Sequence, residues 1–401
     1  MSQPIEAWSS ATRTLTPEQA RRVADSGLVA VELDEPPESW RLKTDSRVGV
    51  VTGNDWEIRV VPRLAIPKLM FLFAYTADRD GWRDSIAEFQ RDPDFFAAVA
   101  SGFAFHALRA IEPGPLRGYV SVDERSYALR GRLRVADQIS RSSGLPLPLE
   151  ITYDEYAIDV PENRILRSAG DLLLRFPRLP ASARKRLLRL RATLEDVEPE
   201  SARVSMPRIT RLNRRYEPAL RLGSLILERA SISTEAGEVK SVSFVFDMNQ
   251  VFEDFLAAAL TEALRPYGGT VRLQYQREFL DRERALRLKP DITWWREGRL
   301  RAVIDAKYKQ LTDARFPNAD AYQMLAYCTG LSQEQGFLVY AQDADQRSRT
   351  HRVRDGDTTI EVRAIDLEAS PDEVLQQVDD LGQEVANSSA RARGQRLVAA
   401  A

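Results

Sequence analysis

The pattern of apolar and polar residues changes character three times along the chain. Over residues 1–110, short β-rich runs alternate with apolar stretches of helical length. Residues 111–235 begin with extended runs and continue as helices, whereas residues 236–386 alternate strand and helix patterns as α/β domains do. Residues 387–401 contain few apolar residues and are predicted to form a disordered tail. The pattern predicts an α/β multidomain protein in which mixed α+β N-terminal and middle regions precede a C-terminal α/β domain.

Individual elements are predicted from their boundaries as well as their periodicity. Thr16 and Gln19 form a capping signature around Pro17, which predicts a helix that ends near residue 26. Further helices are predicted at residues 68–75, 93–111, 161–175, 181–194, 218–230, 246–264 and 319–330. Strands are predicted at residues 48–51, 56–61, 118–122, 126–135, 149–153, 271–278, 292–295, 302–306, 336–340 and 359–364. The polar stretch 231–240 is predicted to be a loop that separates the middle and C-terminal regions.

Composition narrows the class of protein. The 401 residues are 43% hydrophobic and 29% charged, which is typical of a globular protein. No apolar stretch approaches the roughly 20 residues that span a bilayer, and no secretory signal is recognisable, so a cytoplasmic protein without a membrane partner is expected. One cysteine and two histidines exclude internal disulfides and argue against Cys- or His-rich metal sites. Any metal is therefore expected to be held by oxygen ligands.

Charge is balanced overall but uneven along the chain. The net charge of −2 argues against a protein held on nucleic acid by charge alone. Two basic patches nevertheless occur, over residues 181–215 and 271–309. The first patch fits a solvated helix face as well as a DNA contact. The second surrounds the candidate site described below, and from it Arg287, Lys289 and Lys309 are predicted to contact DNA.

The strongest chemical signal lies in two predicted strands of the C-terminal region. Asp305 and Lys307 are two residues apart at the end of an apolar strand, so their side chains project from the same face. Asp291 opens the preceding strand, and a turn at Glu297-Gly298 brings it towards Asp305. An Asp-x-Lys triplet alone is common by chance. Its combination with Pro-Asp, a hairpin and flanking helices favours a PD-(D/E)xK nuclease site over a surface ion pair.

These groups suit the hydrolysis of a phosphodiester. Asp291 and Asp305 supply the oxygen ligands that Mg²⁺ prefers, and the main-chain carbonyl of Ala306 is expected to be a further ligand. The metal polarises the phosphoryl group and lowers the pKa of a water, which becomes the nucleophile. The Lys307 ammonium orients that water or offsets charge on the phosphate. The sequence therefore predicts a Mg²⁺-dependent DNA endonuclease with Asp291, Asp305 and Lys307 as catalytic residues.

Three further residues are predicted to be accessory to this site. Gln323 and Tyr327 are four residues apart and share one face of the following helix. Such a Gln-x-x-x-Tyr helix recurs beside the active site in this nuclease superfamily, although by itself the pair fits ordinary packing. Glu253 lies close to the buried face of an earlier helix, where it fits a second metal ligand or outer support as well as a solvent-facing or capping role.

Several segments of the C-terminal region together match one family. They are Phe246-Asp247-Met248-Asn249 leading into Val251-Phe252-Glu253-Asp254-Phe255, Lys289-Pro290-Asp291-Ile292, Asp305-Ala306-Lys307-Tyr308-Lys309, and Asp320-Ala321-Tyr322-Gln323-Met324-Leu325-Ala326-Tyr327. With them the chain resembles McrC, the nuclease subunit of the McrBC modification-dependent (5-methylcytosine) restriction system. Weaker matches lie upstream, at Leu129-Arg130-Gly131-Arg132-Leu133, Tyr153-Asp154-Glu155, Asn163-Arg164-Ile165-Leu166, Asn213-Arg214-Arg215-Tyr216, Pro218-Ala219-Leu220 and Pro67-Lys68. The resemblance leaves the first fifty residues unplaced.

The resemblance implies a partner and a division of labour. McrC-like chains work with an McrB-like AAA+ GTPase hexamer, which recognises and translocates the DNA. This sequence contains no G-x-x-x-x-G-K-[ST] motif and is therefore not that motor. The N-terminal and middle regions are expected to dock on the ring and stimulate its GTP hydrolysis, while the C-terminal PD-(D/E)xK domain cuts. Two nuclease domains are expected to pair for double-strand cleavage.

Two other functions compete with this interpretation. A stand-alone RecB-like repair or recombination nuclease would share the Gln-x-x-x-Tyr helix but would cut DNA without a GTPase. A non-catalytic interaction subunit would carry a vestigial site, against which the complete set of Asp291, Asp305 and Lys307 argues. Fold alone does not separate these functions.

Overall fold

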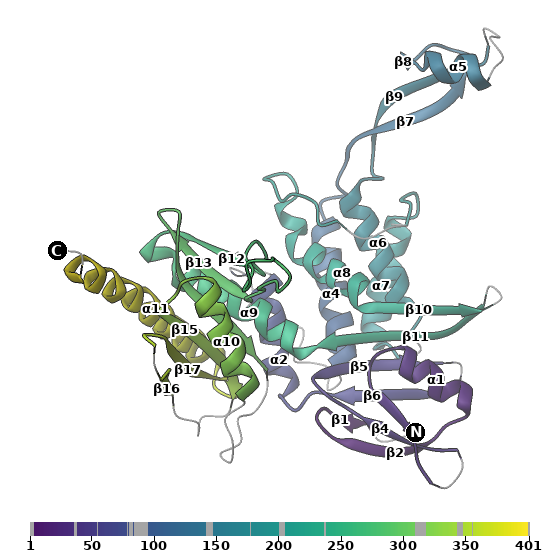
Figure 1. The fold of residues 1–401 in the computed structure, drawn as a ribbon. Coiled ribbons are helices and arrows are strands. Elements are labelled where there is room, and N and C mark those ends of the chain that lie inside the picture. Colours follow the sequence, from purple (N-terminus) through teal and green to yellow (C-terminus); the bar gives the residue numbers. More distant parts are fainter. Residues whose placement is uncertain are drawn as a thin grey trace. The chain divides into compact units, whose positions relative to one another are not determined.

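The computed structural model describes residues 4–35, 38–53, 55–77, 79, 83, 95–141, 147–176, 178–199, 205–235, 238–308, 318–342, 348–354 and 356–399. The chain forms two compact units (Figure 1). The first unit combines Met1–Gln90 with Thr234–Ala401, and the second comprises Arg91–Ser233. No helix among the described residues is long and apolar enough to cross a membrane.

The N-terminal part of the first unit consists of short strands and two helices. The strands are β1 (Ile5–Glu6), β2 (Ser10–Thr14), β3 (Ala30–Leu33), β4 (Ser39–Lys43), β5 (Arg47–Thr52) and β6 (Glu57–Val61), and the helices are α1 (Pro17–Asp25) and α2 (Ile66–Ala77). Strands β2, β4 and β3 form one sheet, and a second has the order β1-β6-β5-β11-β10. The predicted capping box is confirmed, because Thr16 and Gln19 each accept a hydrogen bond from the other's main-chain N–H.

The expected loop at residues 231–240 is wrong, because the segment belongs to a pair of strands, β10 (Ala230–Glu235) and β11 (Glu238–Asp247). Val242, Phe244 and Phe246 alternate along β11 and are buried, and β11 pairs antiparallel with β5 from Val242 to Asp247. Strand β10 pairs with β11, which in turn pairs with β5. Main-chain pairing therefore overrides the polar composition of this segment. The strand also moves the predicted helix start from residue 246 to Met248, where Asp247 caps α9.

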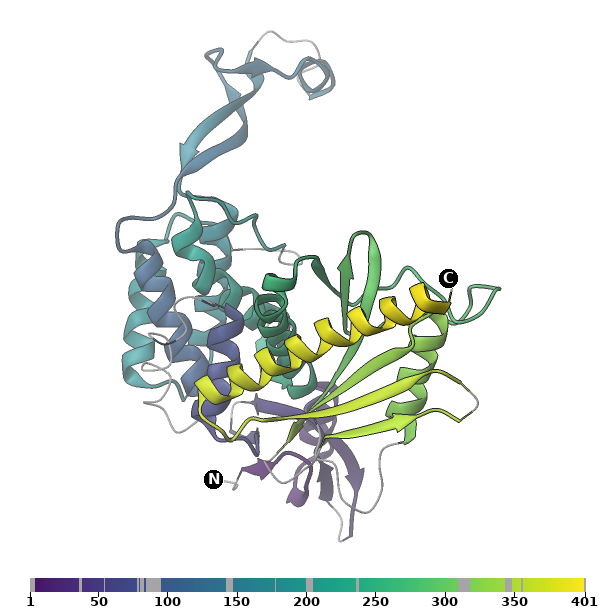
Figure 2. The same cartoon turned by 90° about the vertical axis from the view of Figure 1, so that its left-hand side faces the viewer.

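Helices form the body of the second unit, and an arm projects from it (Figures 1 and 2). The helices are α4 (Phe95–Ile111), α6 (Pro161–Leu174), α7 (Ala181–Thr193), a 3₁₀ turn (Arg214–Tyr216) and α8 (Glu217–Arg229). The arm consists of β7 (Gly118–Ser126) paired with β9 (Leu149–Ala157), together with β8 (Arg132–Leu133) and α5 (Val135–Arg141).

The division into units differs from the predicted boundary at residue 110. Helix α4 is buried along most of its length and packs against α6, α7 and α8, so it belongs to the second unit. The preceding α2 instead packs on α9 of the C-terminal part, where the Phe71 and Phe255 rings lie 5.3 Å apart. Both helices are apolar on nearly every side, so the sequence does not reveal which partner buries each one.

The C-terminal part of the first unit is a six-stranded sheet covered by helices. Its elements are α9 (Met248–Ala263), a 3₁₀ turn (Arg265–Tyr267), β12 (Thr270–Leu273), β13 (Ile292–Arg296), β14 (Arg299–Lys307), α10 (Asn318–Gly330), β15 (Gln335–Gln342), β16 (Arg349–Arg352), β17 (Thr359–Asp366) and α11 (Pro371–Ala399). The strand order is β12-β13-β14-β15-β17-β16. One sheet face packs on α10, with Val303, Leu338 and Met324 in a common core. Helix α11 lies across the sheet (Figure 2).

The predicted disordered tail is wrong, because α11 continues from Pro371 to Ala399. The tail is rich in Ala and Arg, which are strong helix formers. A segment that extends an existing helix avoids the cost of nucleation, so low apolar content did not prevent helix formation here.

Candidate active site

The register of β13 and β14 places two carboxylates together. Ile292 pairs with Ile304 in the antiparallel ladder, so the next residues, Asp291 and Asp305, are neighbours at its end. The Ala306 main-chain N–H donates to Asp291 Oδ2 at 2.9 Å and holds that carboxylate against β14. The pairing that the sequence predicted for Asp291 and Asp305 is therefore present in the structure.

The register is set by the turn at the other end of the two strands. Arg296 pairs with Arg299, and the two residues between them, Glu297 and Gly298, have φ values of 54° and 71°. Left-handed conformations at both central positions are those of a two-residue hairpin turn, which glycine favours. The predicted turn at Glu297-Gly298 is confirmed.

Asp305 is a buried carboxylate with unfilled acceptor capacity. Its side chain is 1% exposed, and the Lys307 Nζ lies 2.6 Å from its Oδ2 as an ion pair. Asp305 Oδ2 is engaged by that ammonium, whereas Oδ1 has no hydrogen-bond donor at bonding geometry among the residues that the structure describes. A buried carboxylate normally has hydrogen bonds to its lone pairs, so this arrangement is typical of a site that receives a cation.

Burial and mutual repulsion shift the protonation of the whole group. Burial raises the pKa of Asp305 to about 7, and the adjacent Asp291 carboxylate adds to the shift. Burial also raises the pKa of Asp291, with a further contribution from the charge of Glu253. Burial alone would lower the pKa of Lys307, but the charges of Asp305 and Asp291 outweigh it and raise that pKa. A divalent cation at this place would relieve the repulsion between the carboxylates.

Glu253 lies on α9 at the edge of this group. It is partly buried, and its Oε1 accepts a hydrogen bond from Gln274 Nε2 at 3.2 Å. Burial raises the pKa of Glu253, and the charge of Asp305 contributes to the shift. The capping alternative does not hold, because Asp247 caps α9. Glu253 is thus close enough to Asp291 and Asp305 to interact with them electrostatically.

Helix α10 fixes the position of the lysine through a chain of hydrogen bonds. Lys307 Nζ donates to Gln323 Oε1 at 3.0 Å, and Gln323 Nε2 donates to the Tyr327 hydroxyl at 2.9 Å. The Tyr327 hydroxyl in turn donates to the Lys289 carbonyl at 2.8 Å, two residues before Asp291. The chain therefore links Lys307 on β14 to the segment that carries Asp291. Gln323 and Tyr327 share one helix face, as predicted, and they also contact the site.

The structure adds residues that the sequence interpretation missed. Tyr340 stands next to Lys307 in the parallel pairing of β14 and β15, and its hydroxyl donates to Asp320 Oδ2 at 2.6 Å. Gln274, with a φ of 43°, donates its main-chain N–H to the Asp291 carbonyl at 2.8 Å. The hydrogen bond of Tyr340 to Asp320 could have been anticipated, because a tyrosine at the end of an apolar strand needs a partner for its hydroxyl. The strained backbone at Gln274 has no counterpart in the sequence pattern.

The predicted DNA-binding residues have different outcomes. Arg287 and Lys289 are exposed, and the Arg287 guanidinium lies 5.3 Å from the Phe279 ring centroid. Lys309 lies outside the described residues. In the other basic patch, Arg184 donates to the Phe176 carbonyl at 3.0 Å and Arg191 lies 3.4 Å from Asp171, so part of that patch has a structural role.

The donor set fits Mg²⁺. Asp291 and Asp305 offer hard oxygen ligands, and Asp305 Oδ1 has no hydrogen-bond partner among the described residues. No group of three or more His, Cys, Asp or Glu side chains that could hold a metal occurs in the part of the chain that the structure describes. Two carboxylates with a main-chain carbonyl suit a cation that keeps several of its waters, as Mg²⁺ does in phosphate-processing sites.

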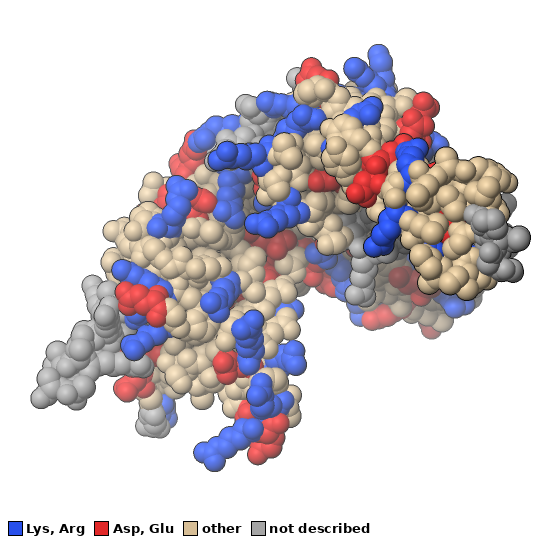
Figure 3. All heavy atoms as spheres, turned by 90° about the horizontal axis from the view of Figure 1, so that it is seen from above, with Lys and Arg blue, Asp and Glu red and all other residues tan. Residues whose placement is uncertain are grey.

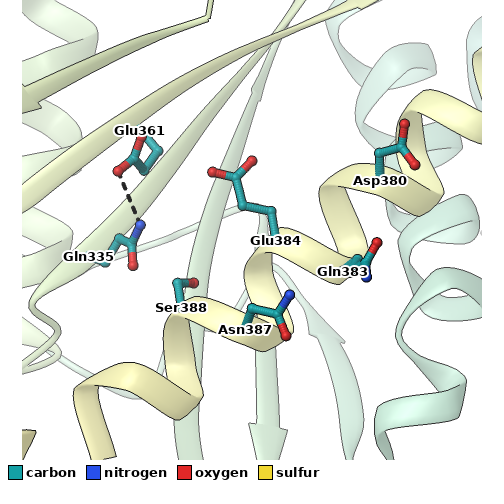
Figure 4. A pocket seen from close by; sticks show the side chains of 7 residues that line it. All are labelled: Gln335, Glu361, Asp380, Gln383, Glu384, Asn387 and Ser388. Carbon is teal, nitrogen blue, oxygen red and sulfur yellow. Dashed lines mark hydrogen bonds between the residues drawn. The ribbon is translucent and has the colours of Figure 1, made fainter.

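A hollow elsewhere in the C-terminal part is lined by polar side chains that are largely engaged with one another. It measures about 350 Å³ and is lined by Gln335, Glu361, Asp380, Gln383, Glu384, Asn387 and Ser388 (Figure 4). Glu361 accepts hydrogen bonds from Gln335 at 3.2 Å and Thr350 at 2.6 Å, and Arg363 bridges Glu361 and Glu384. These pairings engage Glu361 and Glu384, and Asp380 accepts a hydrogen bond from Gln376 at 3.0 Å. None of the catalytic candidates lines the hollow.

The burial of Asp305 predicts a pH-dependent effect of its removal on stability. Folding raises the pKa of Asp305 to about 7, because burial favours the protonated carboxyl. Its contribution to the stability of the folded protein is therefore present at low pH and is lost as the pH rises through about 7. In metal-free protein, Asp305→Asn should therefore raise the unfolding temperature at about pH 8, by the equivalent of about 1–3 kcal/mol, and by less at about pH 5. Asp357→Asn, at an exposed position, should have no such effect. If Asp305→Asn lowered stability equally at both pH values, the claim that ionised Asp305 destabilises the folded protein would be wrong.

Comparison with known proteins identifies the family. The family model described as McrBC 5-methylcytosine restriction system component matches residues 42–341. Among solved structures, the fold is similar to a chain in the refined half-complex from the tetradecameric assembly of Thermococcus gammatolerans McrB AAA+ hexamers with bound McrC. That match has a TM-score of 0.57 and 18% identity, and it covers 94% of this chain and 99% of that chain.

A second match is the cryo-EM structure of the Thermococcus gammatolerans McrBC complex, with a TM-score of 0.41, 18% identity and coverage of 66% of this chain and 89% of that chain. No curated protein sequence matches the chain. At these identities the first structural match shows a shared fold alone, and the second is too distant to add to it. Because the family model covers most of the sequence, the chain belongs to the McrBC 5-methylcytosine restriction system component family.

Proposed function

We propose that the chain is the DNA endonuclease subunit of a GTP-dependent, McrBC-like restriction system. The observation that carries the proposal is the convergence of Asp291, Asp305 and Lys307 at the end of the β13–β14 hairpin, with Asp305 buried and open to a cation. In this proposal the C-terminal part is a PD-(D/E)xK restriction-endonuclease-like domain. Membership of the McrBC family supports a restriction role.

The chain's own residues would hold the metal and the reacting groups. Asp291 and Asp305, with the Ala306 carbonyl, would bind Mg²⁺, which when bound supplies positive charge that polarises the phosphoryl group and acidifies water. Lys307 keeps its proton, because the neighbouring carboxylates raise its pKa. Its ammonium can therefore donate a hydrogen bond to the attacking water or to a phosphate oxygen.

Outer groups would keep the lysine in place during the reaction. Lys307 is 20% exposed at its side chain and is held between Asp305 and Gln323. Because Gln323 is itself fixed by Tyr327, the ammonium has little freedom to turn away from the carboxylates. We assign Gln323 and Tyr327 as positioning residues rather than catalytic ones.

The proposed partner is an McrB-like AAA+ GTPase hexamer. The similar solved structure is an assembly of McrB AAA+ hexamers with bound McrC, and its fold likeness extends over 94% of this chain. This chain lacks a phosphate-binding motif for GTP, so the hydrolysis of GTP would belong to the partner. Recognition of modified cytosine would belong to the partner as well. In this proposal the N-terminal and middle regions dock on the AAA+ ring and stimulate its GTP hydrolysis.

The nuclease assignment predicts a separation of DNA cutting from GTP hydrolysis. With the AAA+ partner, GTP and Mg²⁺, the chain should cut modified DNA, and Asp305→Ala should lower the cleavage rate at least about a hundredfold. Partner GTP hydrolysis should be unchanged, because the variant affects only the cutting site. Asp357→Asn should cut at the normal rate.

Two outcomes of this assay would contradict the proposal in different ways. Normal cleavage by Asp305→Ala would show that the site assignment is wrong. Rapid cleavage by the chain alone without GTP would favour a stand-alone RecB-like nuclease, which shares the helix bearing Gln323 and Tyr327.

The positioning assignment predicts a defect in the chemical step. Tyr327→Phe removes the hydroxyl that fixes Gln323, so kcat for DNA cleavage should fall about 10- to 100-fold while KM stays the same. Tyr322→Phe is a matched control, because Tyr322 is on the same helix but is 67% exposed. An equal effect of both variants, or a rise in KM alone, would contradict the positioning role.

A further inference from the structure

The segment that leads into Asp291 forms an irregular hairpin, residues 278–288, which we call the arginine hairpin. Phe279 and Arg287 form an antiparallel bridge, and the Leu280 main-chain N–H donates to the Leu286 carbonyl at 2.8 Å. The Leu288 N–H donates to the Glu278 carbonyl at 3.0 Å and closes the base. The hairpin thus has main-chain hydrogen bonds of its own, although it lies outside the six-stranded sheet.

A single aspartate shapes the tip of the arginine hairpin. Asp281 Oδ1 accepts the Leu286 N–H at 2.7 Å, and Oδ2 accepts the Ala285 N–H at 3.0 Å. The main-chain hydrogen bonds lower the pKa of Asp281, so it stays ionised in this role. Arg284 has a φ of 59°, which this turn imposes. Both Asp281 oxygens accept main-chain hydrogen bonds, and these bonds hold the tip in one conformation.

The base of the arginine hairpin is attached to the candidate active site. Leu288 is 5% exposed and belongs to the core beneath α10, where its Cδ1 lies 2.4 Å from the position that a Cβ on Gly330 would take. The Lys289 carbonyl accepts a hydrogen bond from the Tyr327 hydroxyl, which is linked through Gln323 to Lys307. The hairpin therefore begins next to the site and cannot move at its base without disturbing these hydrogen bonds.

Three exposed arginines of the hairpin have no acidic partner. Arg282, Arg284 and Arg287 pair with no carboxylate among the described residues. The guanidinium carbons of Arg284 and Arg287 lie 4.8 and 5.3 Å from the Phe279 ring centroid. A guanidinium stacked on a ring keeps its N–H groups free for a ligand in its own plane, while the ring limits its motion.

Two arginines of the six-stranded sheet, in contrast, have acidic partners. Arg301 pairs with Glu297 at 3.3 Å, and Arg363 pairs with Glu361 at 2.9 Å. On the face drawn in Figure 3, Lys and Arg side chains are intermingled with Asp and Glu over much of the surface. The arginine hairpin differs from this mixed surface because two of its three unpaired arginines are fixed on one ring, close to the Asp291 and Asp305 carboxylates. Such a group suits an anionic ligand.

We propose that the arginine hairpin binds the sugar–phosphate backbone of duplex DNA on one side of the phosphate that is cut. This inference rests on the proposed nuclease function and adds the element that holds the substrate. The hairpin extends about five residues from its base, roughly 15 Å, and successive phosphates of one strand are about 3.4 Å apart along the duplex axis. Arg282 and Arg284 at the tip and Arg287 near the base can therefore contact phosphates several nucleotides apart. Arginine suits this task because its planar donors match a phosphate.

The test is DNA binding by the full chain made inactive with Asp305→Asn, measured by fluorescence anisotropy on a short duplex over a range of salt concentrations. Replacing both Arg282 and Arg284 by Ala should weaken binding about 10- to 100-fold and reduce the slope of log K against log salt by about 2. The matched control replaces Arg296 and Arg299 by Ala. These two arginines are exposed at the opposite end of β13 and β14, and their loss should change neither quantity.

Each outcome decides the inference. An unchanged affinity and salt slope in the hairpin variant, an equal loss in the control, or no DNA binding by the parent chain would overturn it. Retained DNA binding with lost binding to the AAA+ partner would assign the hairpin to a protein contact and would overturn it too. Because binding is measured without catalysis, loss of binding in the hairpin variant together with normal cleavage by Asp305→Ala would refute the nuclease site but not the DNA surface.

Discussion

The burial of the Asp305 carboxylate beside the partly buried Asp291 is the constraint on which the rest of the C-terminal domain depends. Asp305 is held at 1% exposure beside Asp291, and its Oδ1 has no hydrogen-bond partner among the described residues. Such a pair is unfavourable for folding on its own, because burial and repulsion both oppose ionisation. The hairpin register, the hydrogen bond from Ala306 and the ion pair with Lys307 together hold it in place.

The surrounding elements are connected to the Asp291–Asp305 pair by packing and hydrogen bonds. Helix α10 packs on the sheet face from which Asp305 and Lys307 project, and its Gln323 and Tyr327 connect the lysine to the main chain at Lys289. The same main chain carries the arginine hairpin on one side and Asp291 on the other. The proposed DNA contact and one metal ligand, Asp291, would therefore lie on one short segment, which Tyr327 and Gln323 connect to Lys307. A displacement of this segment would change the positions of the reacting groups. This arrangement fits a subunit that cuts where a partner has placed the DNA.

Much of the site could be predicted from the sequence because its geometry follows from local rules. Strand alternation put Asp305 and Lys307 on one face, and the Glu297-Gly298 turn fixed the register with Asp291. Helical spacing likewise put Gln323 and Tyr327 together. Contacts between segments that are far apart in the sequence could not be predicted from these local rules. The hydrogen bond from Gln274 to Glu253 and the paired strands β10 and β11 depend on tertiary context.

The fold was predictable to a similar extent and for similar reasons. Strongly periodic helices, such as α6 and α8 in the second unit, appear where the sequence placed them. Strands β1 to β4 are too short for their pattern to be predicted, and the end of helix α11 was hidden by its polar composition. The assignment of α2 and α4 to different units depends on which partner buries each apolar helix. That information lies in the packing and is absent from either helix alone.

The central claim is that Asp291 and Asp305 form a binding site for a divalent cation, and metal binding tests it most directly. Mn²⁺ takes the same oxygen ligands as Mg²⁺, and its binding to the full chain can be followed by electron paramagnetic resonance. The account predicts that the parent chain binds Mn²⁺, that Mg²⁺ displaces it, and that Asp305→Asn abolishes this binding. Equal Mn²⁺ binding by the parent chain and by Asp305→Asn would contradict the account.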